Sequence, residues 1–194
     1  MDHNELHTGF TYCDVDLCIT PELQERRLRS CLIDPAIYGG FVDLTQFCNE
    51  AILAATKSGV SINGNVHTTD RIMCSQRIPL GQPLVMSGKV TRTEPAARGT
   101  LITSEFSFTL PDGTVALKTE RASTRLNRDG SIDHSVARKP SNDLDLSLYS
   151  KVAQCSFSPE RVTDYSSEGR NAIHYDPEVA ARFGYRAPIA GGLM

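Results

Sequence analysis

The chain lacks any apolar run that approaches the roughly 18 residues of a membrane-spanning helix. It also lacks an N-terminal basic segment followed by an apolar stretch, so no secretory signal is visible. Charge of one sign is not in excess, because 20 Lys and Arg stand against 23 Asp and Glu, for a formal net charge of −3. These absences argue against a membrane protein, a secreted protein and a general nucleic-acid binder, and we expect a soluble protein of the cytoplasm.

The six cysteines are spread from Cys13 to Cys155 and include no C-x-x-C pair. Disulfide frameworks belong to short secreted domains, and zinc sites need ligands at closer and more regular spacing. We therefore expect free thiols in a reducing compartment and no metal site.

The clearest helix is predicted over 43–58, where apolar side chains recur at steps of three and four residues. Asp43 and Gln46 have the spacing of a capping box at its start. Gly59 supplies the stop signal at its end. A second, shorter helix is predicted from Ser158 to about Ser167, because serine followed by proline is a strong helix start.

Beyond Gly64 the pattern changes to segments rich in β-branched residues, separated by turn signals. It predicts strands over the segments 68–78, 83–93, 99–110 and 113–126. The Pro111–Gly113 turn predicts an antiparallel hairpin between the last two strands. One long helix followed by antiparallel strands indicates an α+β fold in which the sheet wraps the helix.

The organisation along the chain is one unit over 8–127, a polar linker over 128–150 and a further segment over 151–194. Two stretches, 34–41 and 176–185, echo each other: each reads Asp-Pro, an aliphatic residue, then glycine and an aromatic. The first copy leads into the long helix and the strands, whereas only nine residues follow the second. We therefore expect that 151–194 is the start of a second unit that lacks its helix and sheet.

The segment from residue 157 reads FSPERVTDYSSEGRNAIHYDPEVAARFGYRAPIAGGLM. It resembles the motif of the MaoC-like, hydratase-type hot-dog family, which includes (R)-specific enoyl-CoA hydratases. The positions that match are Ser167, Asn171, Ile173, His174, Asp176, Pro177, Ala180, Gly184, Tyr185, Pro188, Ile189 and Gly192. The resemblance implies a hot-dog fold with a degenerate first unit and a motif-bearing second one, as in double-hot-dog members. It also implies a dimer, or a pairing with another hot-dog chain.

The resemblance further implies a lyase of fatty acid metabolism, a hydratase/dehydratase acting on an acyl-CoA or acyl-carrier thioester without a cofactor. His174 would be the catalytic histidine, Asn171 would support the loop or the water, and the Gly192 N–H would polarise the thioester carbonyl. The family's catalytic aspartate aligns with Gly169 in this sequence. Glu168, one residue earlier, is therefore the candidate carboxylate, and Asp164 is the fallback.

Two alternatives stay open at this point. Gly169 in the aspartate position favours a non-catalytic hot-dog subunit, or an acyl-thioester-binding partner of an active hydratase chain. A thioesterase-type hot-dog would instead need a carboxylate on the long helix, for which Glu50 and Asp43 are candidates. His67, just before the first predicted strand, is a further and weaker candidate for an active-site residue.

Overall fold

The helix predicted over 43–58 is α2 (Gln46–Lys57) in the computed structural model, which describes residues 5–136, 146–152, 154–166 and 171–191. The predicted capping box is wrong. The Asp43 carboxylate accepts hydrogen bonds from the backbone N–H and the hydroxyl of Thr45, at 3.1 and 2.9 Å, so it forms a local turn ahead of the helix. The end of the helix is as predicted, since Gly59 follows it with a positive φ of 70°.

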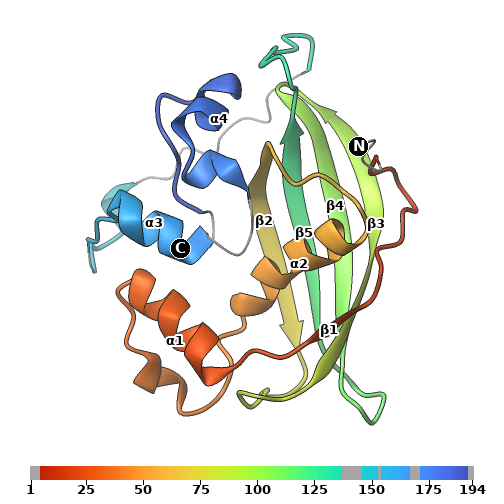
Figure 1. Ribbon diagram of the computed structural model, residues 1–194, viewed down its shortest axis with the longest axis vertical. Coiled ribbons are helices and arrows are strands. Elements are labelled where there is room, and N and C mark those ends of the chain that lie inside the picture. The colour runs from red at the N-terminus through yellow and green to blue at the C-terminus, as the bar shows by residue number, and fades with distance from the viewer. Residues whose placement is uncertain (1–4, 137–145, 153, 167–170, 192–194) are drawn as a thin grey trace.

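Four of the strands match the predicted ones closely: β2 (Asn65–Cys74), β3 (Leu84–Ala96), β4 (Gly99–Thr109) and β5 (Val115–Leu126). With β1 (Val15–Leu17) they form a five-stranded antiparallel sheet in the order β1-β3-β4-β5-β2. Figure 1 shows this sheet curving around α2. The predicted α+β arrangement is confirmed, and β2 lies at one edge of the sheet.

The N-terminal region contains two elements that the sequence reasoning missed, β1 and α1 (Pro21–Ser30). Thr20 caps α1, because its hydroxyl accepts a hydrogen bond from the Leu23 N–H at 3.2 Å, and Pro21 occupies the first helical position. Threonine followed by proline was therefore an available signal for this helix. A short 3-10 helix, η1 (Pro35–Tyr38), follows and is capped by Asp34.

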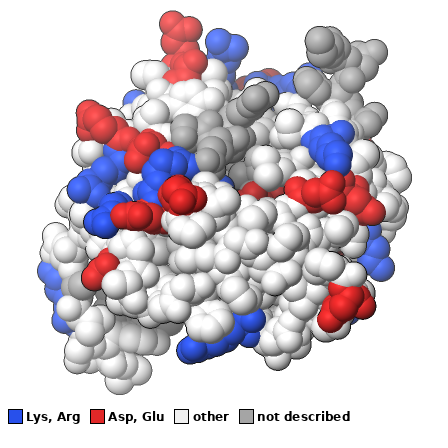
Figure 2. Space-filling view, turned by 60° about the horizontal axis from the view of Figure 1, so that its bottom comes forward, with Lys and Arg blue, Asp and Glu red and all other residues white. Residues whose placement is uncertain are grey.

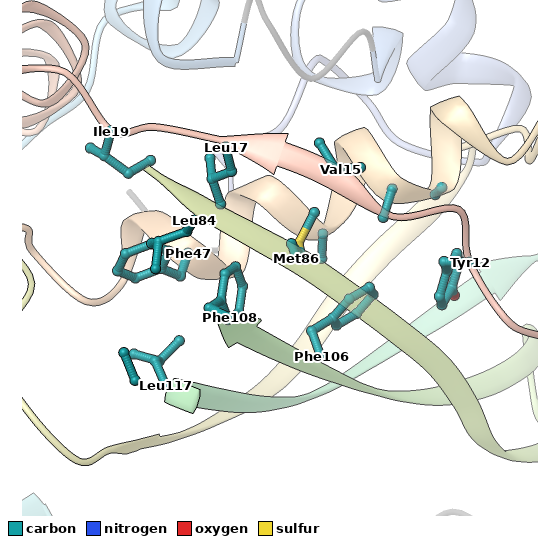
Figure 3. Packing of buried hydrophobic residues seen from close by; sticks show 14 of the residues in the cluster. Tyr12, Val15, Leu17, Ile19, Phe47, Leu84, Met86, Phe106, Phe108 and Leu117 are labelled. Atoms are coloured by element: carbon teal, nitrogen blue, oxygen red, sulfur yellow. The ribbon is translucent and has the colours of Figure 1, made fainter. Parts of the chain in front are cut away.

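The hydrophobic core fills the space between α2 and the concave face of the sheet (Figure 3). Phe47 of α2, Met86 of β3 and Phe108 of β4 are fully buried, and the rings of Phe47 and Phe108 lie 4.9 Å apart. Tyr12 stacks on Phe106 at 5.1 Å. Truncating a buried phenylalanine to alanine costs about 3–5 kcal/mol, so this contact of helix and sheet is a main source of stability.

The C-terminal segment contains η2 (Leu146–Leu148), α3 (Pro159–Ser166), η3 (Ala172–His174) and α4 (Pro177–Arg182). The predicted helix after Ser158 is confirmed as α3, which packs against α1. The Ser30 hydroxyl donates to Asp164 Oδ2 at 2.9 Å across this contact. Asp176 caps α4 by accepting from two backbone N–H groups. Figure 1 shows α3 and α4 beside the β2 edge of the sheet.

Charged side chains of both signs are interspersed on the face that Figure 2 shows, in keeping with the small net charge. Among the described helices, none is both long and apolar enough to cross a membrane. Nor do the described residues bring together three or more His, Cys, Asp or Glu side chains that could hold a metal ion.

Candidate active site

A cavity of about 580 Å³ lies where the C-terminal segment meets α2 and the inner face of the sheet. This volume is within the range of small-molecule sites. Most of its lining is apolar, and its polar side chains come from elements far apart in the sequence. They include Tyr12, Asn49 of α2, His67 of β2, Ser104 of β4, Arg121 of β5 and His174 of η3. The cavity therefore brings the motif-bearing segment and the first unit together at one place.

His174 lies in the wall of this cavity, as the sequence motif predicted for an active-site histidine. Its Nδ1 is 2.8 Å from the carbonyl oxygen of Ile189. Because a carbonyl can only accept, Nδ1 carries the hydrogen, and Nε2 of the neutral ring keeps its lone pair. Burial lowers the pKa of His174, and the contact with Ile189 opposes this only in part. The ring is thus a neutral base at pH 7, with Nε2 as its basic atom.

Asn171 ties the motif to the edge strand. Its Nδ2 donates to the carbonyl oxygen of Asn65, the first residue of β2, at 3.0 Å. The side-chain oxygens of both asparagines are buried, and no residue in the described part of the chain donates a hydrogen bond to them. Each such oxygen costs about 1–3 kcal/mol if it stays unpaired. Two buried acceptors at one end of β2 thus suit a ligand or water that can donate hydrogen bonds.

The motif-bearing segment is held against the sheet by a second set of contacts. Arg98 Nη2 donates to the Phe183 carbonyl oxygen at 2.8 Å, and its guanidinium lies 5.4 Å from the centre of the Tyr185 ring. The Phe183 ring packs directly on the backbone of Gly64, which precedes β2. These contacts fix the segment that carries His174.

Three of the other candidate positions lie outside the described residues, and a fourth does not line the cavity. Glu168 and Gly192 lie outside the described residues, as does Gly169, so their roles stay predictions. Asp164, the fallback carboxylate, faces α1 through its hydrogen bond to Ser30 and does not line the cavity.

The two carboxylates considered for a thioesterase are engaged in local contacts. Glu50 lines the cavity, but it is buried against Arg27, with Oε1 2.7 Å from the Arg27 Nη1. Arg27 also donates to the side-chain oxygen of Gln46 at 2.9 Å. Asp43 is bound by Thr45 as described above and does not line the cavity. Neither carboxylate is thus placed as a free base, and the thioesterase alternative loses its main support.

The structure adds a pair that the sequence reasoning did not identify, His67 and Asp70 of β2. His67 Nε2 lies 2.6 Å from Asp70 Oδ2, and the two side chains are only 14% and 7% exposed. On a regular strand, residues three apart point to opposite faces. Here a bulge at Thr68 shifts the register, so that His67 pairs with Ser123 and Asp70 with Arg121. Both side chains therefore lie on the inner face, which strand periodicity alone could not have shown.

Arg121 is the cation beside this pair. Its guanidinium donates to the backbone carbonyl of Cys48 on α2. Burial lowers the pKa of Arg121, whereas the nearby charge of Asp70 acts to raise it. Burial and the Asp70 charge together raise the pKa of the Cys48 thiol to about 12. The charge of Asp70 thus acts on the Cys48 thiol of α2 and on the Arg121 guanidinium of β5.

These elements define the class of the protein: a long helix wrapped by a curved antiparallel sheet, with a cavity along the helix, is a hot-dog fold. No protein-family model matches the chain, and no curated protein matches it in sequence. The solved structure of HtdX from Mycobacterium tuberculosis is similar, with a TM-score of 0.75 and 19% identity over 93% of this chain and 73% of that one.

Two further structures are similar in fold. A MaoC-like dehydratase has a TM-score of 0.68 and 18% identity, covering 96% of this chain and 74% of that one. The HadBC (3R-hydroxyacyl-ACP dehydratase) complex from Mycobacterium tuberculosis has a TM-score of 0.51 and 14% identity, covering 60% of this chain and 95% of that one. At these identities the likeness establishes the fold, and the prediction of a hot-dog fold is confirmed. The division of the chain into one complete and one truncated unit stays a prediction.

Proposed function

We propose that the protein is a hydratase/dehydratase that adds or removes water at the 2-enoyl thioester of an acyl-CoA or acyl carrier. The observation that carries this proposal is the placement of His174. The histidine of the family motif lines a cavity of ligand size and keeps a basic nitrogen, Nε2, in its neutral form. The dehydratases among the similar structures support the same class of reaction.

The chemistry follows from that nitrogen. His174 Nε2 takes a proton from water as the water oxygen forms a bond to the β-carbon. The π electrons of the enoyl double bond then move toward the α-carbon and the thioester oxygen. A proton delivered to the α-carbon completes the 3-hydroxyacyl product, and dehydration is the reverse. General-base catalysis of this kind contributes roughly 10²- to 10⁴-fold in rate.

The remaining catalytic roles come from the sequence resemblance. The Gly192 N–H would stabilise the charge that develops on the thioester oxygen, and Glu168 would help His174 orient the water. Asn171 supports the loop through its hydrogen bond to Asn65. The apolar part of the cavity lining, which includes Leu17, Ile52 and Ile62, suits the acyl chain.

The test is hydration of crotonyl-CoA, followed by the loss of enoyl absorbance. His174→Ala is expected to lower kcat by about 10²- to 10⁴-fold. His134→Ala is the matched control, because His134 is an exposed histidine away from the cavity. Equal rates for the wild type and His174→Ala would remove His174 from the mechanism.

A second candidate function is a non-catalytic hot-dog subunit that binds an acyl thioester or pairs with an active chain. The observation that favours it is Gly169, which stands where the family has its catalytic aspartate. The similarity to the HadBC complex is in keeping with a dimer or a hetero-oligomer of hot-dog chains. A chain that binds acyl-CoA without hydrating it, or that copurifies with a second hot-dog chain, would support this function.

We further propose that the protein works in the cytoplasm. All six cysteines fall in the described part of the chain, and there none forms a disulfide, which suits a reducing compartment.

A further inference from the structure

We propose that His67, positioned by Asp70, is a second acid–base group of the cavity and delivers the proton to the α-carbon of the acyl thioester. This proposal rests on the hydration chemistry proposed above and deepens it. It concerns a pair on the first unit of the chain, outside the sequence motif.

A bulge in β2 brings the two side chains of the pair together. Thr68 is the extra residue, and its hydroxyl donates to the backbone carbonyl of Ala122 on β5 at 2.7 Å. Bulges interrupt a ladder and re-aim side chains, and they are common next to active sites. This one places an imidazole and a carboxylate side by side on the buried face of an edge strand.

The side chains of His67 and Asp70 lie in direct contact. His67 Nε2 lies 2.6 Å from Asp70 Oδ2, although their relative orientation does not suit a hydrogen bond. Both Asp70 oxygens are buried, and the Cys48 thiol on α2 is within hydrogen-bonding reach of this carboxylate. Since Nε2 faces Asp70, Nδ1 is the ring nitrogen left for a ligand. His67 lines the cavity, so a ligand there can reach its ring.

The charge of Asp70 shapes the electrostatic surroundings of His67. A carboxylate beside a histidine stabilises the imidazolium, the form of the ring that can donate a proton. Groups that titrate or carry charge interact with Asp70 or line the cavity that His67 lines. Arg121 on β5 and Cys48 on α2 interact with Asp70, and the cavity lining includes Tyr12 in the N-terminal arm, Arg27 on α1, Glu50 on α2, Tyr165 on α3 and His174 on η3. Burial keeps the Cys48 and Tyr165 groups uncharged at neutral pH, because it raises the pKa of each to about 12.

His174 and His67 line the same cavity and would act in the same reaction. Hydration of an enoyl thioester needs a base for the water proton and an acid for the α-carbon. His174 is the neutral base, and Asn171 anchors its segment to Asn65, two residues before His67 on the same strand. In its imidazolium form, His67 gives the Nδ1 proton to the α-carbon and becomes neutral, while neutral His174 takes a proton from water and becomes the cation. Afterwards His174 loses a proton to solvent and His67 gains one, so the net reaction consumes one water.

The pair also accounts for the main departure of the sequence from the family motif. With Gly169 in the aspartate position, the motif itself no longer supplies the carboxylate expected there. Asp70 puts a buried carboxylate beside His67, and it is His67 that lines the cavity.

The experiment is steady-state hydration of crotonyl-CoA by the full chain, with melting temperature and pH profile for each variant. We expect His67→Gln to lower kcat at least about 100-fold, the size of a lost general acid, with KM and melting temperature close to wild type. Asp70→Asn, which keeps the shape but removes the charge, should lower kcat about tenfold or more. Thr69→Ala, an exposed position on β2 beside the bulge, and His134→Gln are the controls.

The pH profile separates a catalytic role from a structural one. A general base and a general acid that act together give a bell-shaped pH profile of kcat/KM, and its low-pH limb belongs to His174, whose pKa is lowered by burial. His67→Gln should remove the fall at high pH, which a merely structural histidine would not do. If His67→Gln does not fold, Asp70→Asn gives the same test through the shape of its high-pH limb.

Three results would overturn the proposal. Wild-type kcat and an unchanged pH profile in His67→Gln would remove His67 from the reaction while leaving His174 in place. A lower melting temperature with unchanged kcat would make the pair structural. An inactive wild type would refute the hydratase function itself, and this proposal with it, and is recognised without any His67 variant.

Discussion

The contact between Gly64 and Phe183 gives a sharp test of how the motif-bearing segment is held. Gly64 has a φ of +78°, and a Cβ added there would lie 2.5 Å from Cε1 of the Phe183 ring. Gly81 has almost the same φ, +79°, but a Cβ there would meet nothing within 4 Å. Gly64→Ala and Gly81→Ala therefore share the same backbone strain, and only the first adds a clash.

The magnitudes follow from these two terms. An L-residue in the left-handed region costs about 1–2 kcal/mol, which both variants should show. Overpacking adds about 1–3 kcal/mol more, in Gly64→Ala alone. The Phe183 carbonyl oxygen is held by Arg98 at 2.8 Å, so the ring has to rotate out of its packing on Gly64 or move together with the segment. The extra cost should therefore appear as local opening of the segment.

Hydrogen exchange of backbone amides measures that opening. The amides of Ala180 and Tyr185, which bond to Asp176 and Ala180 within the segment, should exchange about 5- to 150-fold faster in Gly64→Ala than in Gly81→Ala. Amides of β4 should differ little between the two. In a Phe183→Ala background the difference should vanish. Equal exchange in the two variants, or a difference that survives Phe183→Ala, would refute the argument.

Three other predictions concern buried ionisable groups. Arg27→Met removes the cation that faces buried Glu50 and should cost about 3–5 kcal/mol in urea unfolding, whereas Arg27→Met with Glu50→Met should cost less; additive costs would contradict the coupling. Burial lowers the pKa of His174 below its usual 6.5, so the unfolded chain binds more protons at this residue as the pH falls. The free energy of unfolding should therefore be highest above pH 6.5 and decrease as the pH falls toward the pKa of the folded protein. Urea unfolding of His174→Gln should lack this decrease, and the same decrease in the variant would contradict the argument. The Cys48 thiol, with a pKa raised to about 12, should resist a thiol reagent in the native protein at neutral pH, while exposed Cys13 reacts; equal labelling rates would refute the burial argument.

The sequence predicted the elements whose periodicity is carried by their own residues. The stripe on α2 and the β-branched segments of β2 to β5 each follow a local rule, and the structure confirms them. The short β1 strand has only the residues Val15–Leu17, too few for a period to be read, and it owes its place to pairing with β3. The capping box failed for a similar reason, because Gln46 is drawn to Arg27 by a tertiary contact.

The candidate site shows the same contrast between local sequence patterns and tertiary contacts. His174 belongs to a motif with a recognisable order of residues, and it was found from that order. The partnership of His67 with Asp70 depends on one additional residue in a strand and on the register with β5, which no spacing rule reports. Arg121 likewise reads as an ordinary strand residue until the pairing sets it opposite Asp70.

The bulge at Thr68 changes how many residues separate His67 and Asp70 along β2. A β2 strand shorter by this one residue would leave His67 and Asp70 two residues apart, and both would still point to the same, inner face of a regular strand. All the side chains that carry charge would still be present in the sequence. Comparing chains of this fold by the spacing of these two residues alone would then miss their equivalence, because the bulge absorbs the one residue by which the spacing differs.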